Sequence, residues 1–129
     1  MLEQKKISVC FTADQFEKYA DGKSTVVVVD VLRATSVIST AFMEGVEAVI
    51  PVQTLDEALS YKGKEGCIVA AERNAKPIKG FDYGNSPFHY INSEVKGKTL
   101  VLTTTNGTKA IHNAREHKVI TASYINIEA

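Results

Sequence analysis

The sequence contains no tryptophan and no excess of either charge. Its 15 Lys and Arg residues are balanced by 15 Asp and Glu residues, so the formal net charge at pH 7 is +0. A surface that binds nucleic acid or anionic lipid needs a basic excess. We therefore exclude a general nucleic-acid-binding protein and a binder of anionic membranes.

Long apolar runs and abundant cysteines are also missing. The longest apolar run is far too short to span a bilayer, and no amino-terminal stretch suits a signal peptide. Cys10 and Cys67 both fall in segments that we predict as strands. Buried free thiols in a cytoplasmic protein are the favoured interpretation, and a disulfide between the two stays open at this stage.

Three familiar phosphate motifs are missing as well. No G-x-x-x-x-G-K-[ST] loop occurs, which excludes a Walker-type nucleotide binder. Asp30 follows a run of valines, but the second residue after it is Leu32 and not a second acid, so the usual pair of an aspartate-nucleophile enzyme is absent. Cys67 and Arg73 have the C-x5-R spacing of thiol phosphatases. The residues between them are typical of a strand, which places the two about 20 Å apart, too far for one cradle.

The most informative stretch surrounds Asp30. The unbroken run Val26–Val29 predicts a strand buried on both faces, as in parallel sheets. Apolar residues then recur at helical spacing until Gly45, which predicts a helix and its end. Asp30, Arg33 and Thr35 therefore stand between a strand and a helix start, where open parallel sheets bind ligands and where anions are attracted. Ordinary helix capping by these side chains is the alternative interpretation.

The remaining chain alternates between apolar and polar segments. Thr54 and Glu57 have capping-box spacing at the start of a predicted helix over 54–62. Strands are predicted at 7–11, 26–29, 46–52, 67–71, 99–102 and 119–122, and a long irregular stretch at 74–86. This alternation predicts one α/β domain over 1–129, a three-layer α/β/α fold with a largely parallel sheet and helices on both faces.

Polar residues follow several of the predicted strands. Because the carboxyl ends of parallel strands share one edge of a sheet, we expect these residues to meet there. Guanidinium groups suit phosphate or sulfonate oxygens, and carboxylates suit magnesium. Threonines are also good strand formers, and a Glu–Arg pair also forms ordinary surface ion pairs. The residues concerned are Asp30, Arg33, Glu72, Arg73, Asp82, Thr103–Thr108 and Ser123.

Four ordered motifs together resemble the 2-phosphosulfolactate phosphatase (ComB) family. They are Asp30–Thr35 (DVLRAT), Glu72–Arg73, Gly80–Pro87 (GFDYGNSP) and Thr103–Thr108 (TTTNGT). The resemblance implies a magnesium-dependent phosphatase that converts 2-phospho-3-sulfolactate to sulfolactate, a step toward coenzyme M in methanogens. It also implies that the 129 residues form the amino-terminal part of a longer fold.

The resemblance and the residue chemistry together give a set of candidate site residues. Either direct attack by water or an enzyme-bound intermediate is compatible with them, and a homo-oligomer stays open. An anion-binding, catalytically incomplete module is the alternative function. The predicted catalytic residues are Asp30, Arg33, Glu72 and Asp82, of which Asp30, Glu72 and Asp82 are the predicted magnesium ligands. The predicted residues for a small phosphorylated and sulfonated substrate are Thr35, Arg73, Asn85, Thr104, Thr105, Asn106, Gly107, Thr108 and Ser123.

Overall fold

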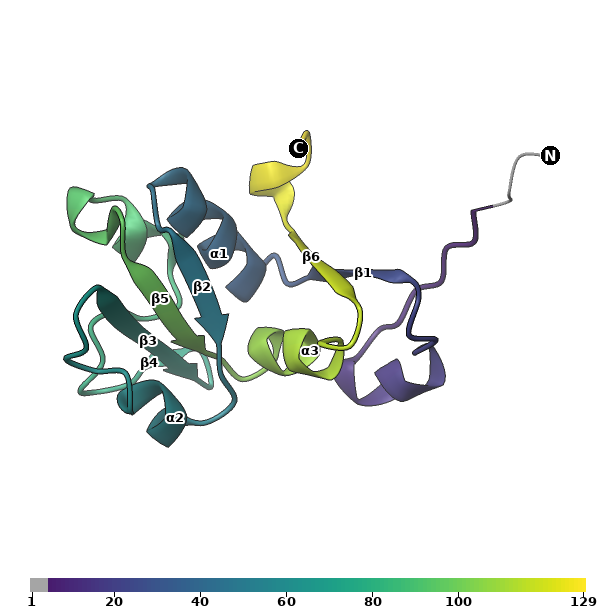
Figure 1. Ribbon diagram of the computed structural model, residues 1–129, viewed down its shortest axis with the longest axis horizontal. Coiled ribbons are helices and arrows are strands. Elements are labelled where there is room, and N and C mark those ends of the chain that lie inside the picture. The colour runs from purple at the N-terminus through teal and green to yellow at the C-terminus, as the bar shows by residue number, and fades with distance from the viewer. Residues whose placement is uncertain (1–4) are drawn as a thin grey trace.

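A computed structural model describes residues 5–129 (Figure 1). It confirms the α/β class with mostly parallel strands. The strands are β1 (Thr25–Val29), β2 (Ala48–Pro51), β3 (Cys67–Arg73), β4 (Lys76–Pro77), β5 (Thr99–Thr103) and β6 (Lys118–Ala122). The α-helices are α1 (Ala34–Met43), α2 (Leu55–Leu59) and α3 (Gly107–Asn113). Short 3-10 helices are η1 (Ala13–Lys18), η2 (Pro87–Tyr90), η3 (Ser93–Val95) and η4 (Tyr124–Asn126).

The strands divide between two sheets instead of forming the single sheet that we expected. One sheet has the order β2-β5-β3-β4, in which β4 is the antiparallel member. The other is a parallel pair of β1 and β6, which lies beside the larger sheet with α1 and α3 close to both (Figure 1). The carboxyl ends of β1, β3 and β5 therefore come from two sheets.

Helices cover both faces of the larger sheet. On one face, Val37 and Ile38 of α1 share a core with Leu100 and Leu102 of β5. On the other face, α2 packs against β3 and β5, where Val101 points the opposite way from its neighbours. This alternation along β5 follows from the two-residue period of a strand. The layering of helix, sheet and helix is thus as predicted.

Strand β1 differs from the prediction. Val28 is buried, but Val27 and Val29 are 53% and 63% exposed, so the strand is not buried on both faces. The reason is that α3 packs against β1 on one face, whereas the opposite face of the β1–β6 pair is open.

The predicted first strand, at 7–11, is not formed. Ile7, Val9 and Phe11 are all strongly exposed, and within residues 5–129 no backbone hydrogen bond joins this segment to a strand. The alternating pattern is present, but a partner strand is not. Cys10 therefore lies outside any strand, whereas Cys67 begins β3. Both thiols are free, and both are half-buried instead of buried as expected.

The structure confirms the sequence signals predicted for the start of α2 and the end of α1. The Thr54 hydroxyl accepts a hydrogen bond from the Glu57 amide at 3.1 Å, and the Glu57 carboxylate accepts one from the Gln53 amide at 3.2 Å. Gly45 follows α1 with a φ of 93°, a left-handed conformation that favours glycine. Within residues 5–129, no helix is long and apolar enough to cross a bilayer.

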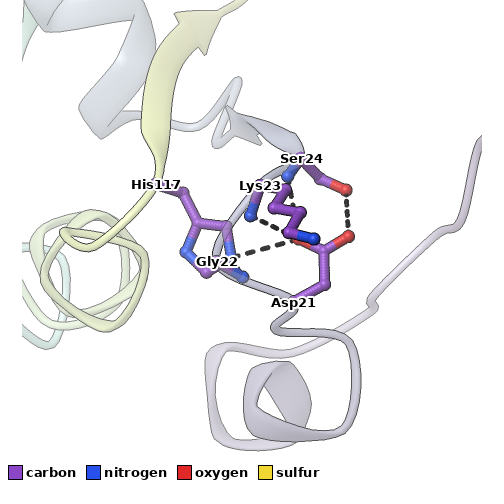
Figure 2. A network of polar contacts seen from close by, with 5 residues as sticks. All are labelled: Asp21, Gly22, Lys23, Ser24 and His117. Atoms are coloured by element: carbon purple, nitrogen blue, oxygen red, sulfur yellow. Dashed lines mark hydrogen bonds and ion pairs between the residues drawn. The ribbon is translucent and has the colours of Figure 1, made fainter.

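The turn before β1 is tied to the start of β6 by a polar network (Figure 2). The Asp21 carboxylate accepts hydrogen bonds from the Ser24 hydroxyl and from the amides of Ser24 and Lys23, at 2.5, 2.8 and 2.9 Å. These donors hold the pKa of Asp21 well below its usual range. The Gly22 amide donates to Nε2 of His117 at 3.0 Å. Because Ser24 bonds Asp21 and not His117, the three side chains do not form a nucleophilic triad.

Candidate functional site

A polar pocket of about 240 Å³ opens where β1, β3 and β5 end. Two carboxylates, one guanidinium and several amides line it. Most of the lining residues were predicted from sequence, whereas Leu32, Asn74 and Ala75 were not. The complete lining is Asp30, Leu32, Arg33, Glu72, Asn74, Ala75, Asn85, Thr105 and Asn106.

Asp30 is held at the junction of β1 and α1. Its amide donates to the Thr35 hydroxyl at 2.9 Å, and its Oδ2 accepts from the Ala34 amide at 3.2 Å. The Thr35 hydroxyl in turn donates to the Ala122 carbonyl of β6 at 2.7 Å. Thr35 is therefore a buried brace behind the pocket and does not line it. Asp30 therefore accepts a hydrogen bond from the first amide of α1 and also lines the pocket.

Gly107 allows α3 to approach Asp30 closely. A Cβ at this position would lie 2.8 Å from Oδ2 of Asp30 and 2.3 Å from the Cβ of Ala34. Both distances are shorter than real Cβ atoms tolerate, so a side chain here would push α1 and α3 apart. The glycine predicted for ligand approach serves instead for the approach of one helix to another.

Glu72 is buried and held by three donors. Its Oε1 accepts from the Ala75 amide at 2.6 Å and from the Thr105 hydroxyl at 3.2 Å. Its Oε2 faces the Thr105 amide at 3.4 Å. Hydrogen bonds to a carboxylate are stronger than those between neutral groups, so the orientation of this side chain is well defined.

The turn after Glu72 has an unusual backbone. Asn74 and Ala75 have φ values of 54° and 62°, and they connect β3 to β4 in a two-residue hairpin. Positive φ at both central positions is the pattern of a type I′ turn, which usually has glycine second. Alanine in this region costs about 1 kcal/mol. The turn directs the Ala75 amide at Glu72. The signal that sequence reasoning passed over was Asn74, an Asn two residues beyond the Ala71–Glu72 junction at which the predicted strand ends.

Asn85 presents an unpaired oxygen. It is 5% exposed, it lines the pocket, and its Oδ1 is buried without a hydrogen-bond partner. An unsatisfied buried acceptor costs about 1–3 kcal/mol. Such an oxygen is available to a cation or to a donor on a ligand. The sequence motif named this residue, and the structure places it among the pocket carboxylates.

Four further predicted residues, Arg73, Thr104, Thr108 and Ser123, lie outside the pocket lining. The Arg73 guanidinium donates to the Glu72 carbonyl, the Gln53 carbonyl and the Thr103 hydroxyl. It therefore connects strands instead of facing the pocket. Thr104 and Thr108 bond each other at the start of α3, and the Ser123 hydroxyl caps η4. The hydrogen-bonding groups of these side chains therefore already have partners in the nearby backbone.

Asp82 is separated from the other two predicted metal ligands. Its Oδ2 accepts from the Val69 amide at 2.9 Å, and its Oδ1 lies 3.8 Å from the Lys62 ammonium. Across residues 5–129, no three His, Cys, Asp or Glu side chains gather as they would around a metal ion. Of the three predicted magnesium ligands, Asp30 and Glu72 line the pocket, together with Asn85.

Comparison with known proteins connects this pocket to a family. The family model described as 2-phosphosulpholactate phosphatase matches residues 10–129. A probable 2-phosphosulfolactate phosphatase of Thermotoga petrophila is 54% identical over 105 residues, which cover 81% of this chain and 46% of the relative. A protein of the same description from Clostridium acetobutylicum is 43% identical over 127 residues, 96% of this chain and 54% of the relative. The chain spans about half the length of the curated relatives it matches. It belongs to the 2-phosphosulpholactate phosphatase family.

Proposed function

We propose that this pocket takes part in the magnesium-dependent hydrolysis of 2-phospho-3-sulfolactate to sulfolactate and phosphate. Membership of the family supports the reaction. The observation that carries the proposal is the pocket itself, in which Asp30, Glu72 and an unpaired Asn85 oxygen lie together with the Arg33 guanidinium.

The charge of the pocket supports the need for a cation. The substrate carries phosphate, sulfonate and carboxylate, whereas the pocket has two carboxylates and one guanidinium. Like charges about 4 Å apart repel by about 4 kcal/mol at a dielectric constant typical of a protein surface. An anionic substrate therefore binds here only if a positive charge compensates for Asp30 and Glu72.

The oxygen ligands fit magnesium. This ion usually takes one or two carboxylates together with water and substrate phosphate oxygens. Asp30, Glu72 and Oδ1 of Asn85 would hold it, and the ion would satisfy the buried oxygen of Asn85. Magnesium bound there neutralises charge on the phosphoryl group and polarises it.

The chain's own groups then orient the substrate and its water. The Arg33 guanidinium binds two anionic oxygens side by side. Both carboxylate oxygens of Glu72 accept hydrogen bonds within the protein. In Asp30, Oδ2 accepts a hydrogen bond from the Ala34 amide, so Oδ1 is the oxygen that can contact the reacting centre. In the reaction, the oxygen of water ends on phosphorus as the ester P–O bond breaks. The sulfolactate oxygen leaves with the bonding electrons and takes up a proton.

The test is phosphate release from 2-phosphosulfolactate by the purified chain, with and without magnesium. Asp30→Asn should reduce the magnesium-dependent rate by at least about 100-fold, the usual effect of a group that moves a proton. Glu72→Gln should also reduce this rate, because it removes one of the two carboxylates that would hold magnesium. Asp56→Asn and Glu65→Gln are matched controls, because both side chains are exposed and lie outside the pocket. Equal rates in site and control variants would refute the assignment.

A second arm addresses the alternative function. Calorimetry with sulfolactate and magnesium measures binding by the same variants without any need for turnover. Binding that is lost in Glu72→Gln, together with no phosphate release beside an active Thermotoga petrophila relative, would assign this chain an anion-binding role. This alternative is favoured by one observation, which is that the chain covers 46% of that relative.

A further inference from the structure

The β1–β6 pair is incompletely covered. Val27 and Ile120 are neighbours in register, and with Val29 they are 53%, 44% and 63% exposed on the open face of the pair. Parallel strands in proteins are almost always buried on both faces, and a sheet of two strands is marginal in water. The pair therefore has the surface of strands inside a larger sheet.

One edge of β1 is also unpaired. β6 occupies the other edge, and within residues 5–129 no further strand pairs with β1. A groove of about 140 Å³ runs along it, lined by Val26–Val29, Cys10–Ala13, Phe16 and Ala110. A free edge with apolar walls offers backbone N–H and C=O groups to an incoming strand.

The segment at 7–11 leads into the opposite wall of the groove, which Cys10–Ala13 form. Ile7, Val9 and Phe11 alternate with smaller residues, and they are 89%, 64% and 87% exposed. This pattern predicts a strand, and among the described residues, 5–129, no strand pairs with it. A strand added at the free edge of β1 would lie at the usual spacing of about 4.8 Å from it.

We propose that this groove binds one extended, apolar strand from a polypeptide equivalent to the half of the relatives that this chain does not match. The lengths of the relatives favour this origin of the strand, because this chain matches only 46% and 54% of two of them. A second copy of this chain is less suited, since its own Cys10–Ala13 already line its own groove. The inference concerns an interaction surface and does not depend on the proposed activity.

The test is co-expression of this chain, carrying a tag, with the unmatched part of the Thermotoga petrophila relative. We expect a 1:1 complex on purification, measured by light scattering. Hydrogen exchange should slow by at least about tenfold in the complex at those amides of Val26–Val29 that face away from β6, because the free edge becomes paired. A complex that leaves these amides unchanged would overturn the proposal.

Two lysine variants make the test specific. Val27→Lys places a charge on the open valine face, and it should weaken the complex by at least about tenfold because the charge would be buried. Met43→Lys is the matched control, since Met43 is 72% exposed on α1 and away from the groove. Equal effects of the two variants would overturn the proposal. Failure of the partner to co-purify with the tagged chain, whether the partner is soluble or not, would also overturn the proposal. Self-association of the tagged chain instead of binding to the partner would do the same.

Discussion

The contact between Gly107 and the start of α1 gives the sharpest prediction. In Gly107→Ala the new Cβ would lie 2.3 Å from the Cβ of Ala34, whereas carbon atoms in contact prefer about 3.5–4.0 Å. At least about 1 Å of movement between α1 and α3 is needed. Overpacking of this kind costs about 1–3 kcal/mol, and the upper half of that range applies because both contacting atoms are attached to helix backbone.

The measurement is urea and thermal unfolding of Gly107→Ala. For a chain of this size, 2–3 kcal/mol lowers Tm by about 8–15 °C. Gly63→Ala is the control, since Gly63 has a φ of 79° but nothing within 4 Å of an added Cβ. It should cost only the backbone strain of about 1 kcal/mol.

A double-mutant cycle separates this clash from other causes. Ala34→Gly removes the atom at 2.3 Å, and alone it should cost about 1 kcal/mol as a glycine within a helix. Combined with Gly107→Ala, it should recover at least about 1 kcal/mol relative to the sum of the two single changes. Additive effects, or a Gly107→Ala variant as stable as the parent, would refute this reasoning. Magnesium-dependent phosphate release should fall with Gly107→Ala and remain with Gly63→Ala, since only the former displaces Asp30.

Three further predictions concern the pocket and the turn before β1. Ala75→Gly should raise stability by about 0.5–1 kcal/mol, seen as a higher urea midpoint, because glycine tolerates the φ of 62°; a lower midpoint would contradict this. Thr105→Val removes one donor to Glu72 and should cost about 1 kcal/mol, with Thr105→Ser retaining most of the stability. The folded-state pKa of Asp21 lies below its ordinary 3.8, so its contribution is present above that pH and is lost as the pH falls below it. Asp21→Asn should flatten the acid side of the unfolding profile below about pH 4, and an unchanged profile would argue against this network.

The predictable part of the site follows from strand topology. Asp30, Glu72 and Thr105 were placed together because parallel strands end at a common edge, and this rule needs only the order of strands and helices. The three residues do line one pocket, although Asp30 follows a strand of a different sheet from the one that contains Glu72. Thr54 was read correctly for a similar reason, because capping depends on residues three positions apart.

The parts that sequence missed depend on partners distant in the chain. Val27 is as apolar as Val28, and it is exposed because, within residues 5–129, no layer covers that face of β1–β6. Arg73 and Asp82 have side chains suited to a ligand, but nearby backbone groups satisfy both. The role of Ala75 could not be predicted from its side chain, because it acts through a backbone amide whose direction depends on φ.

The division of the strands between two sheets has a consequence for the energetics of the pocket. Asp30 follows a strand of one sheet, whereas Glu72 and Thr105 come from the other. A ligand that contacts both sides joins the two sheets, so its binding free energy is linked to their mutual orientation. At 100 times its Kd, such a ligand adds about 2.7 kcal/mol to the folded state. Such a ligand should therefore make the unfolding of the two sheets more cooperative.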